Sequence, residues 1–116
     1  MDLHGMPAPP SPVACDMTGA PDTPAERMDE YRRLFSQSLL GRSRAPDRIS
    51  FRFRADPGVE DWVRDLARRE KACCAFFDFT VDADGREVRW EARVAADEAA
   101  RQMLAGFYRL PDITGS

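Results

Sequence analysis

Residues 77–94 read FDFTVDADGREVRWEARV, and apolar and polar residues alternate on both sides of the pair Asp84-Gly85. Alternation with a period of two is typical of a half-buried strand, and an Asp-Gly pair between two such runs is typical of a tight hairpin. The segment therefore predicts two antiparallel strands that share one apolar face.

The residues before this hairpin predict a third strand. Ile49, Phe51 and Phe53 alternate with a serine and with arginines, so one face of this strand is expected to be buried and the other to be basic and wet. Residues 42–47 are polar, and we expect a loop there.

Three segments carry helix signals. Thr23-Pro24-Ala25-Glu26 is a capping box with proline at the first helical position, and Gly41 is expected to end that helix. Asp56-Pro57 predicts the start of a second helix, and a third is expected to start near Asp97. Each has apolar residues at helical spacing, so each is expected to bury one face.

The order helix, strand, helix, strand, strand, helix predicts an α+β fold. We expect a small antiparallel sheet of three or four strands covered by helices, a broadly ferredoxin-like two-layer sandwich. Residues 15–110 are expected to form the single domain, residues 1–14 a flexible, proline-rich arm and residues 111–116 a C-terminal tail. Val13–Met17 is the candidate for a fourth strand.

Composition excludes several classes of protein. The 116 residues are 43% hydrophobic and 32% charged, with a net charge of -3, which indicates one globular domain. A mildly acidic chain is not expected to bind nucleic acid by itself. Because no apolar run approaches the ~20 residues of a membrane span, no membrane partner is expected either. Three cysteines, two of them adjacent, do not form a secreted disulfide framework, so we expect reduced thiols and a cytoplasmic location.

The second helix carries a conflict with its own apolar pattern. The stripe that begins at Val59 and Val63 has Glu70, Cys73 and Cys74 at its next inward positions. Burying an ionised carboxylate costs several kcal/mol unless an arginine, a shared proton or a nearby cation compensates it. Such departures from pattern tend to mark functional sites.

Cys15, Cys73, Cys74 and Glu70 are therefore the candidate metal-binding residues. Three thiolates that converge would form a site for a soft ion, namely Hg(II), Cu(I), Zn(II) or arsenite, with Glu70 as a ligand or a neighbour of the ligands. Because the dipole at a helix C-terminus disfavours a thiolate, a metal or another cation has to stabilise it. In the alternative interpretation, the helix ends before Cys73 and the cysteines pack as small apolar side chains.

The segment Arg69-Glu70-Lys71-Ala72-Cys73-Cys74-Ala75-Phe76-Phe77-Asp78-Phe79, together with the early Cys15, resembles a family of small, uncharacterised bacterial proteins. In that family a lone early Cys precedes a Glu-x-x-Cys-Cys-x-Phe-[Phe/Leu]-x-Phe motif. Similar segments are appended to regulators of the mercury-responsive type, which implies a link to heavy-metal handling. A weaker likeness is to organomercurial lyase, but the cysteine spacing differs, so no catalytic role is transferred.

Three hypotheses follow for the function. The sequence favours a soft-metal binding protein that serves sensing, sequestration or resistance, with the metal ion as its partner. The alternatives are a thiol-dependent enzyme acting on a thiophilic substrate, and a plain interaction domain that forms a homodimer through its open sheet face while its cysteines only pack. No catalytic residue and no organic cofactor are assigned.

Overall fold

The computed structural model describes residues 21–113, which form one four-stranded sheet and four helices. The elements in chain order are α1 (Pro24–Ser38), β1 (Leu39–Ala45), β2 (Arg48–Arg54), α2 (Val59–Cys73), β3 (Asp78–Ala83), β4 (Glu87–Arg93), α3 (Glu98–Tyr108) and α4 (Leu110–Ile113). Residues 1–20 lie outside the described part, and with them the predicted arm, the candidate strand Val13–Met17 and Cys15.

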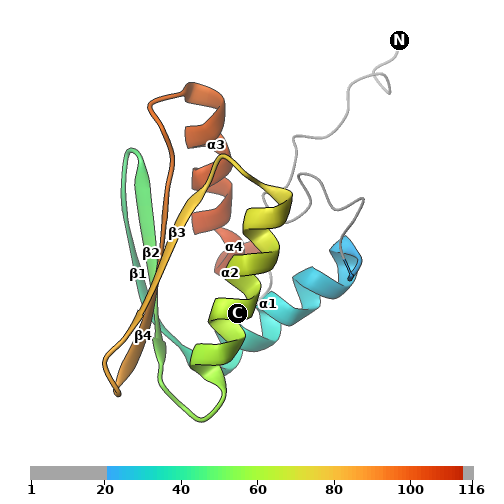
Figure 1. Ribbon diagram of the computed structural model, residues 1–116, viewed down its shortest axis with the longest axis vertical. Helices are drawn as coiled ribbons and strands as arrows, with labels where there is room; N and C mark the ends of the chain where they lie inside the picture. The colour runs from blue at the N-terminus through green and yellow to red at the C-terminus, as the bar shows by residue number, and fades with distance from the viewer. Residues whose placement is uncertain (1–20, 114–116) are drawn as a thin grey trace.

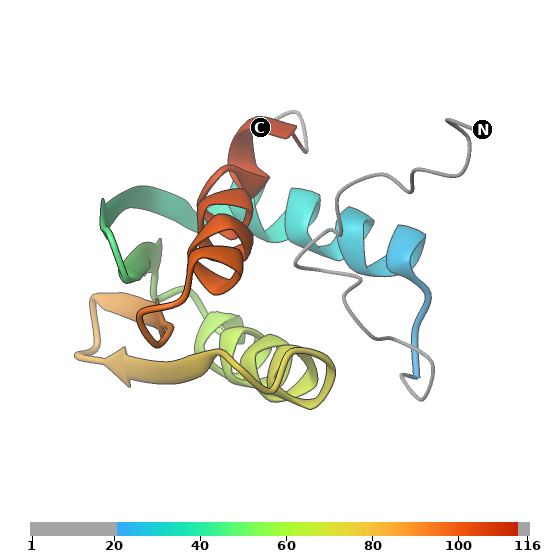
Figure 2. The same cartoon turned by 90° about the horizontal axis from the view of Figure 1, so that it is seen from above.

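The sheet is antiparallel throughout, with the strand order β1-β2-β4-β3. Its strands come as two hairpins, β1–β2 and β3–β4, and α2 connects them. The helices lie on one face of the sheet (Figures 1 and 2). The predicted α+β class and its two layers are thereby confirmed.

The main correction concerns residues 42–47, where a loop was predicted. β1 runs through this segment to Ala45 and pairs with β2 across a two-residue turn at Pro46 and Asp47. α1 accordingly ends at Ser38, with Leu39 as its C-cap, and does not extend to Gly41, where its end was expected. The polar sequence of β1 carries little alternation, because this strand lies at the edge of the sheet and owes its conformation to pairing with β2.

The two long helices begin differently from one another. The predicted capping box of α1 is present, since Thr23 Oγ1 accepts from the Glu26 N–H and the Glu26 carboxylate accepts from the Thr23 N–H. Asp56, in contrast, does not cap α2. The N-cap is Gly58, whose φ of 88° is accessible to glycine but strained for other residues.

The core lies between the sheet and the helices, and aromatic rings dominate it. Phe51, Phe53, Phe77, Trp90 and Phe107 are each no more than 1% exposed. Phe76, in contrast, is 44% exposed, because it lies in the turn that leaves α2.

The domain extends past residue 110. Leu110 and Pro111 are buried in α4, so the predicted tail begins too early, and the chain stays packed as far as this short helix. Among the described helices, none combines the length and the apolar character that crossing a membrane requires.

Candidate functional site

Glu70 lies on the face of α2 that packs against the core. α2 buries Val59, Val63, Leu66 and Ala67 one to three turns before it, and the same face carries Glu70 inward, where it is 1% exposed. The burial predicted for this carboxylate is confirmed.

The compensating groups come from α1. The Tyr31 hydroxyl donates a hydrogen bond of 2.8 Å to Glu70 Oε2, and Arg27 Nη1 lies 3.3 Å from the same oxygen. Of the compensating groups that the sequence left open, the structure supplies an arginine, with a phenol beside it. Glu70 Oε1 is buried and has no hydrogen-bond partner in the described residues, so the carboxyl group is only half satisfied.

Burial sets the protonation of this cluster. Desolvation raises the pKa of Glu70 to about 7, although the hydrogen bond from Tyr31 and the charge of Arg27 act in the opposite direction. Burial, together with the charge of Glu70, raises the pKa of Tyr31. The pKa of Asp22 is lowered, chiefly by its hydrogen bonds from Arg27. Glu70 is thus the group of this cluster that can exchange a proton near neutral pH.

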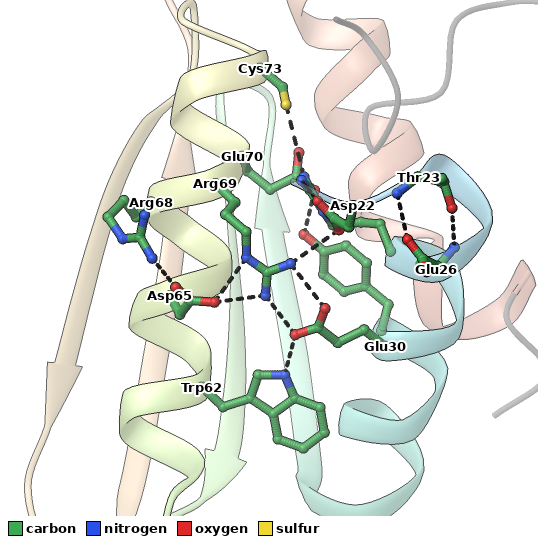
Figure 3. A network of polar contacts seen from close by, with 12 residues as sticks. Asp22, Thr23, Glu26, Glu30, Trp62, Asp65, Arg68, Arg69, Glu70 and Cys73 are labelled. Atoms are coloured by element: carbon green, nitrogen blue, oxygen red, sulfur yellow. Dashed lines mark hydrogen bonds and ion pairs between the residues drawn. The ribbon is translucent and has the colours of Figure 1, made fainter. Parts of the chain in front are cut away.

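The cysteine pair lies at the end of α2. Cys73 is the last helical residue and Cys74 is the C-cap, so the helix does not stop before the cysteines. The apolar packing that the alternative expected is present at Cys74, which belongs to the hydrophobic core. Cys73 Sγ lies 4.0 Å from Arg27 Nη1, the nitrogen that also contacts Glu70. Figure 3 shows this sulfur directed from the end of α2 toward the polar network around Glu70. The thiol and the carboxyl group therefore share one guanidinium.

The two cysteines differ in exposure and oxidation state. Cys73 is half-buried and in the thiol form, whereas Cys74 is 0% exposed and disulfide-bonded. The expectation that all three thiols are reduced is therefore not met at Cys74. Cys15 lies outside the described residues, so the convergence of three sulfurs stays a prediction. Within residues 21–113, no group of three or more His, Cys, Asp or Glu side chains is arranged to hold a metal ion.

A ring of ion pairs surrounds the buried cluster and joins α1 to α2. Arg27 and Arg69 contact four carboxylates between them, those of Asp22, Glu30, Asp65 and Glu70. Arg68 pairs with Asp65 as well, and carboxylates still outnumber the guanidinium groups. Because Glu70 is about half protonated near neutral pH, the positive and negative charges of this network nearly balance.

Arg27 and Tyr31 are the residues that sequence reasoning missed as part of the site. The inward stripe of α1 runs through Arg27, Tyr31, Leu34, Phe35 and Ser38, so it begins with an arginine. Arg27 is 0% exposed. An arginine on the inward stripe of one helix and a glutamate on that of another were the signal for a buried ion pair.

When the chain is compared with protein-family models, curated proteins and solved structures, no family model, no curated protein and no solved structure matches it. The function therefore rests on the geometry of the chain itself.

Proposed function

We propose that the protein binds a soft heavy-metal or metalloid ion through cysteine thiolates at the end of α2. Cys73 and Cys74 supply two sulfurs and Cys15 the third, while Glu70 acts beside them. Soft sulfur ligands favour Hg(II), Cu(I), Zn(II) or arsenite over Mg(II) and Ca(II). Because Cys74 is disulfide-bonded here, the site loads in the reduced protein, which is the form maintained in a cytoplasm.

The observation that carries this proposal is the position of the Cys73 thiol beside Arg27. A thiolate is the metal-binding form of cysteine, and the Arg27 guanidinium lies 4.0 Å from the Cys73 sulfur. A thiolate at a helix C-terminus needs a positive charge nearby, and Arg27 on α1 carries one.

Glu70 gives the site a means to balance charge. Near neutral pH its carboxyl group is close to half protonated, because its pKa is about 7. A cation bound at Cys73 favours the ionised form, so loading is expected to release a proton from Glu70. The unsatisfied Oε1 is the oxygen available to face such an ion.

Titration of the reduced full chain with Hg(II) tests the proposal. We expect a saturable thiolate charge-transfer band at about one equivalent per chain. Cys73→Ser and Cys15→Ser are each expected to weaken binding by about tenfold or more, since each removes a ligand. Met103→Leu, which removes a sulfur on α3, serves as the control and is expected to bind normally. A band that does not saturate, or equal affinity in the Cys73→Ser variant, would overturn the proposal.

A thiol-dependent enzyme is the second candidate, and the protonation of Glu70 favours it. A carboxyl group with a pKa of about 7 can donate and recover a proton during each turnover. A binding protein retains one ion per chain, whereas an enzyme releases product in repeated turnovers. Multiple turnovers of a thiophilic substrate, abolished in the Glu70→Gln variant, would favour the enzyme.

The face of the sheet opposite the helices is the candidate surface for the association of two copies. It carries both arginines and carboxylates, such as Arg52 with Glu87 and Arg48 with Glu91. Pairing of two copies there is the remaining hypothesis. Light scattering of the apo and loaded protein tests it, and a monomeric mass in both states would exclude it.

A further inference from the structure

A second candidate site lies away from the α1–α2 network, between the β1–β2 hairpin and α3. It is a cavity of about 380 Å³, within the size range of small-molecule pockets. The apolar side chains Ile49 and Leu104 belong to its lining, and Pro46 closes the hairpin end. Arg44 from β1 and Arg101 from α3 line it too, and no acidic residue does.

Arg101 has an unsatisfied donor at this cavity. Its Nε–H is buried and has no hydrogen-bond partner among residues 21–113. A buried donor without a partner is destabilising, by more when the group is charged. The side chain of Arg101 also lines the cavity, so it places a positive charge there.

Arg44 places a second positive charge at the same cavity. Its guanidinium lies over the ring of Tyr108, 5.1 Å from the ring centroid, which restrains its orientation. Neither Arg44 nor Arg101 forms an ion pair with the part of the chain that the structure describes. The neighbouring Arg42, by contrast, is neutralised by Asp112. The positive charge at the cavity therefore has no counter-ion among residues 21–113.

We propose that this cavity binds a small organic carboxylate that carries an apolar tail. The carboxylate accepts hydrogen bonds from Arg101 and Arg44, because guanidinium donors match its planar geometry. The tail packs on Ile49 and Leu104. A fully polar anion would leave those side chains without a partner, and a neutral apolar molecule would leave the arginines without one.

Octanoate, octanol and acetate are the probes that separate these possibilities, each titrated into the full chain while amide chemical shifts are recorded. We expect saturable shifts for octanoate at Ile49, Leu104 and their neighbours. Octanol, which lacks the charge, and acetate, which lacks the tail, are each expected to bind about tenfold more weakly or worse. Octanol binding as tightly as octanoate would overturn the proposal, and so would octanoate shifts that do not saturate.

Substitutions assign the binding to the cavity. Arg101→Gln is expected to weaken octanoate binding about tenfold, whereas Arg109→Gln, an exposed arginine at the end of the same helix, is expected to leave it unchanged. Equal weakening in both variants would show general charge attraction and contradict the proposal. If Arg101→Gln does not fold, Arg44→Gln is the deciding variant, with the same expected loss.

Discussion

The carboxyl group of Glu70 depends on groups from a different helix. Tyr31 donates to it, Arg27 pairs with it, and Arg27 in turn contacts Cys73. Arg27 and Glu70 are both almost completely buried, so each needs the other. A change at either residue is therefore expected to act on stability and on the thiol together.

Glu70→Leu is expected to destabilise the fold by about 1–3 kcal/mol, although leucine suits the apolar stripe of α2. The reason is that Arg27 would keep a buried charge with one partner fewer, and the Tyr31 hydroxyl would lose its acceptor. Urea denaturation of the wild type and the variant measures this loss. The double variant Arg27→Met with Glu70→Leu removes both charges and is expected to recover much of it; no recovery would contradict the buried-pair explanation.

The protonation of Glu70 predicts a pH dependence of stability. Its folded pKa of about 7 lies above the ordinary value of 4.5, so the folded protein holds the proton more tightly than the unfolded chain. The stability this contributes is complete below about pH 4.5, is lost as the pH rises to about 7, and amounts to roughly 3 kcal/mol.

Glu70→Gln isolates this contribution, since it cannot titrate. Among the groups that face Glu70, Asp22 titrates below this window and Tyr31 above it, while Arg27 and Arg69 stay charged. The free energy of unfolding of the wild type minus that of the variant, measured by urea from pH 4.5 to 7.5, is expected to fall and then level off. A constant difference would show that Glu70 does not titrate in this range.

At the scale of single elements, α2 shows how a helix start depends on backbone conformation. Asp56 and Pro57 have the composition of a helix start, but the chain first makes a turn in which the Val59 N–H donates to the Asp56 carbonyl. Gly58 then takes up the positive φ that joins this turn to the helix. The entry angle of α2, and with it the position of Glu70, depends on this glycine.

Gly58→Ala is accordingly expected to destabilise the protein by about 1 kcal/mol, because a Cβ is strained at this φ even though no neighbouring atom obstructs it. Asp56→Ala is the matched control. Within the part of the chain that the structure describes, its side chain makes only an exposed ion pair with Arg54, so a change within about 0.5 kcal/mol is expected. Thermal or urea unfolding measures both, and the reverse order would mean that Asp56 acts as the cap.

Across the whole molecule, the aromatic core joins the helices to the sheet. Phe107 from α3 is its central member, with ring contacts to Tyr31, Phe51, Phe77, Phe79 and Trp90. These rings come from α1, β2, β3 and β4 and from the turn after α2. Their packing therefore couples every layer of the domain.

Phe107→Ala is expected to destabilise the domain by about 3–5 kcal/mol, because it opens a cavity in the middle of this cluster. Phe76→Ala removes an equal side chain from a position that is 44% exposed and is expected to change the stability far less, by about 0.5 kcal/mol. Urea denaturation followed by tryptophan fluorescence measures both. A similar loss in the two variants would contradict the central role of Phe107.

Local patterns in the sequence were by themselves enough to determine several elements. The capping box at Thr23, the Asp84-Gly85 hairpin and the alternation of Ile49, Phe51 and Phe53 each predict a structure that is present. The inward position of Glu70 also followed from helical periodicity alone. In each case, the signal lies in residues that are close in sequence.

Only the tertiary structure decided what surrounds these elements. β1 is a strand because β2 pairs with it, and Arg27 and Tyr31 belong to the site because α1 packs against α2 at Glu70. Arg27 and Glu70 are 43 positions apart, and no periodicity within one helix indicates which residue of another will face it. Long-range contacts of this kind follow from the packing of finished elements, whose partners a local pattern does not specify.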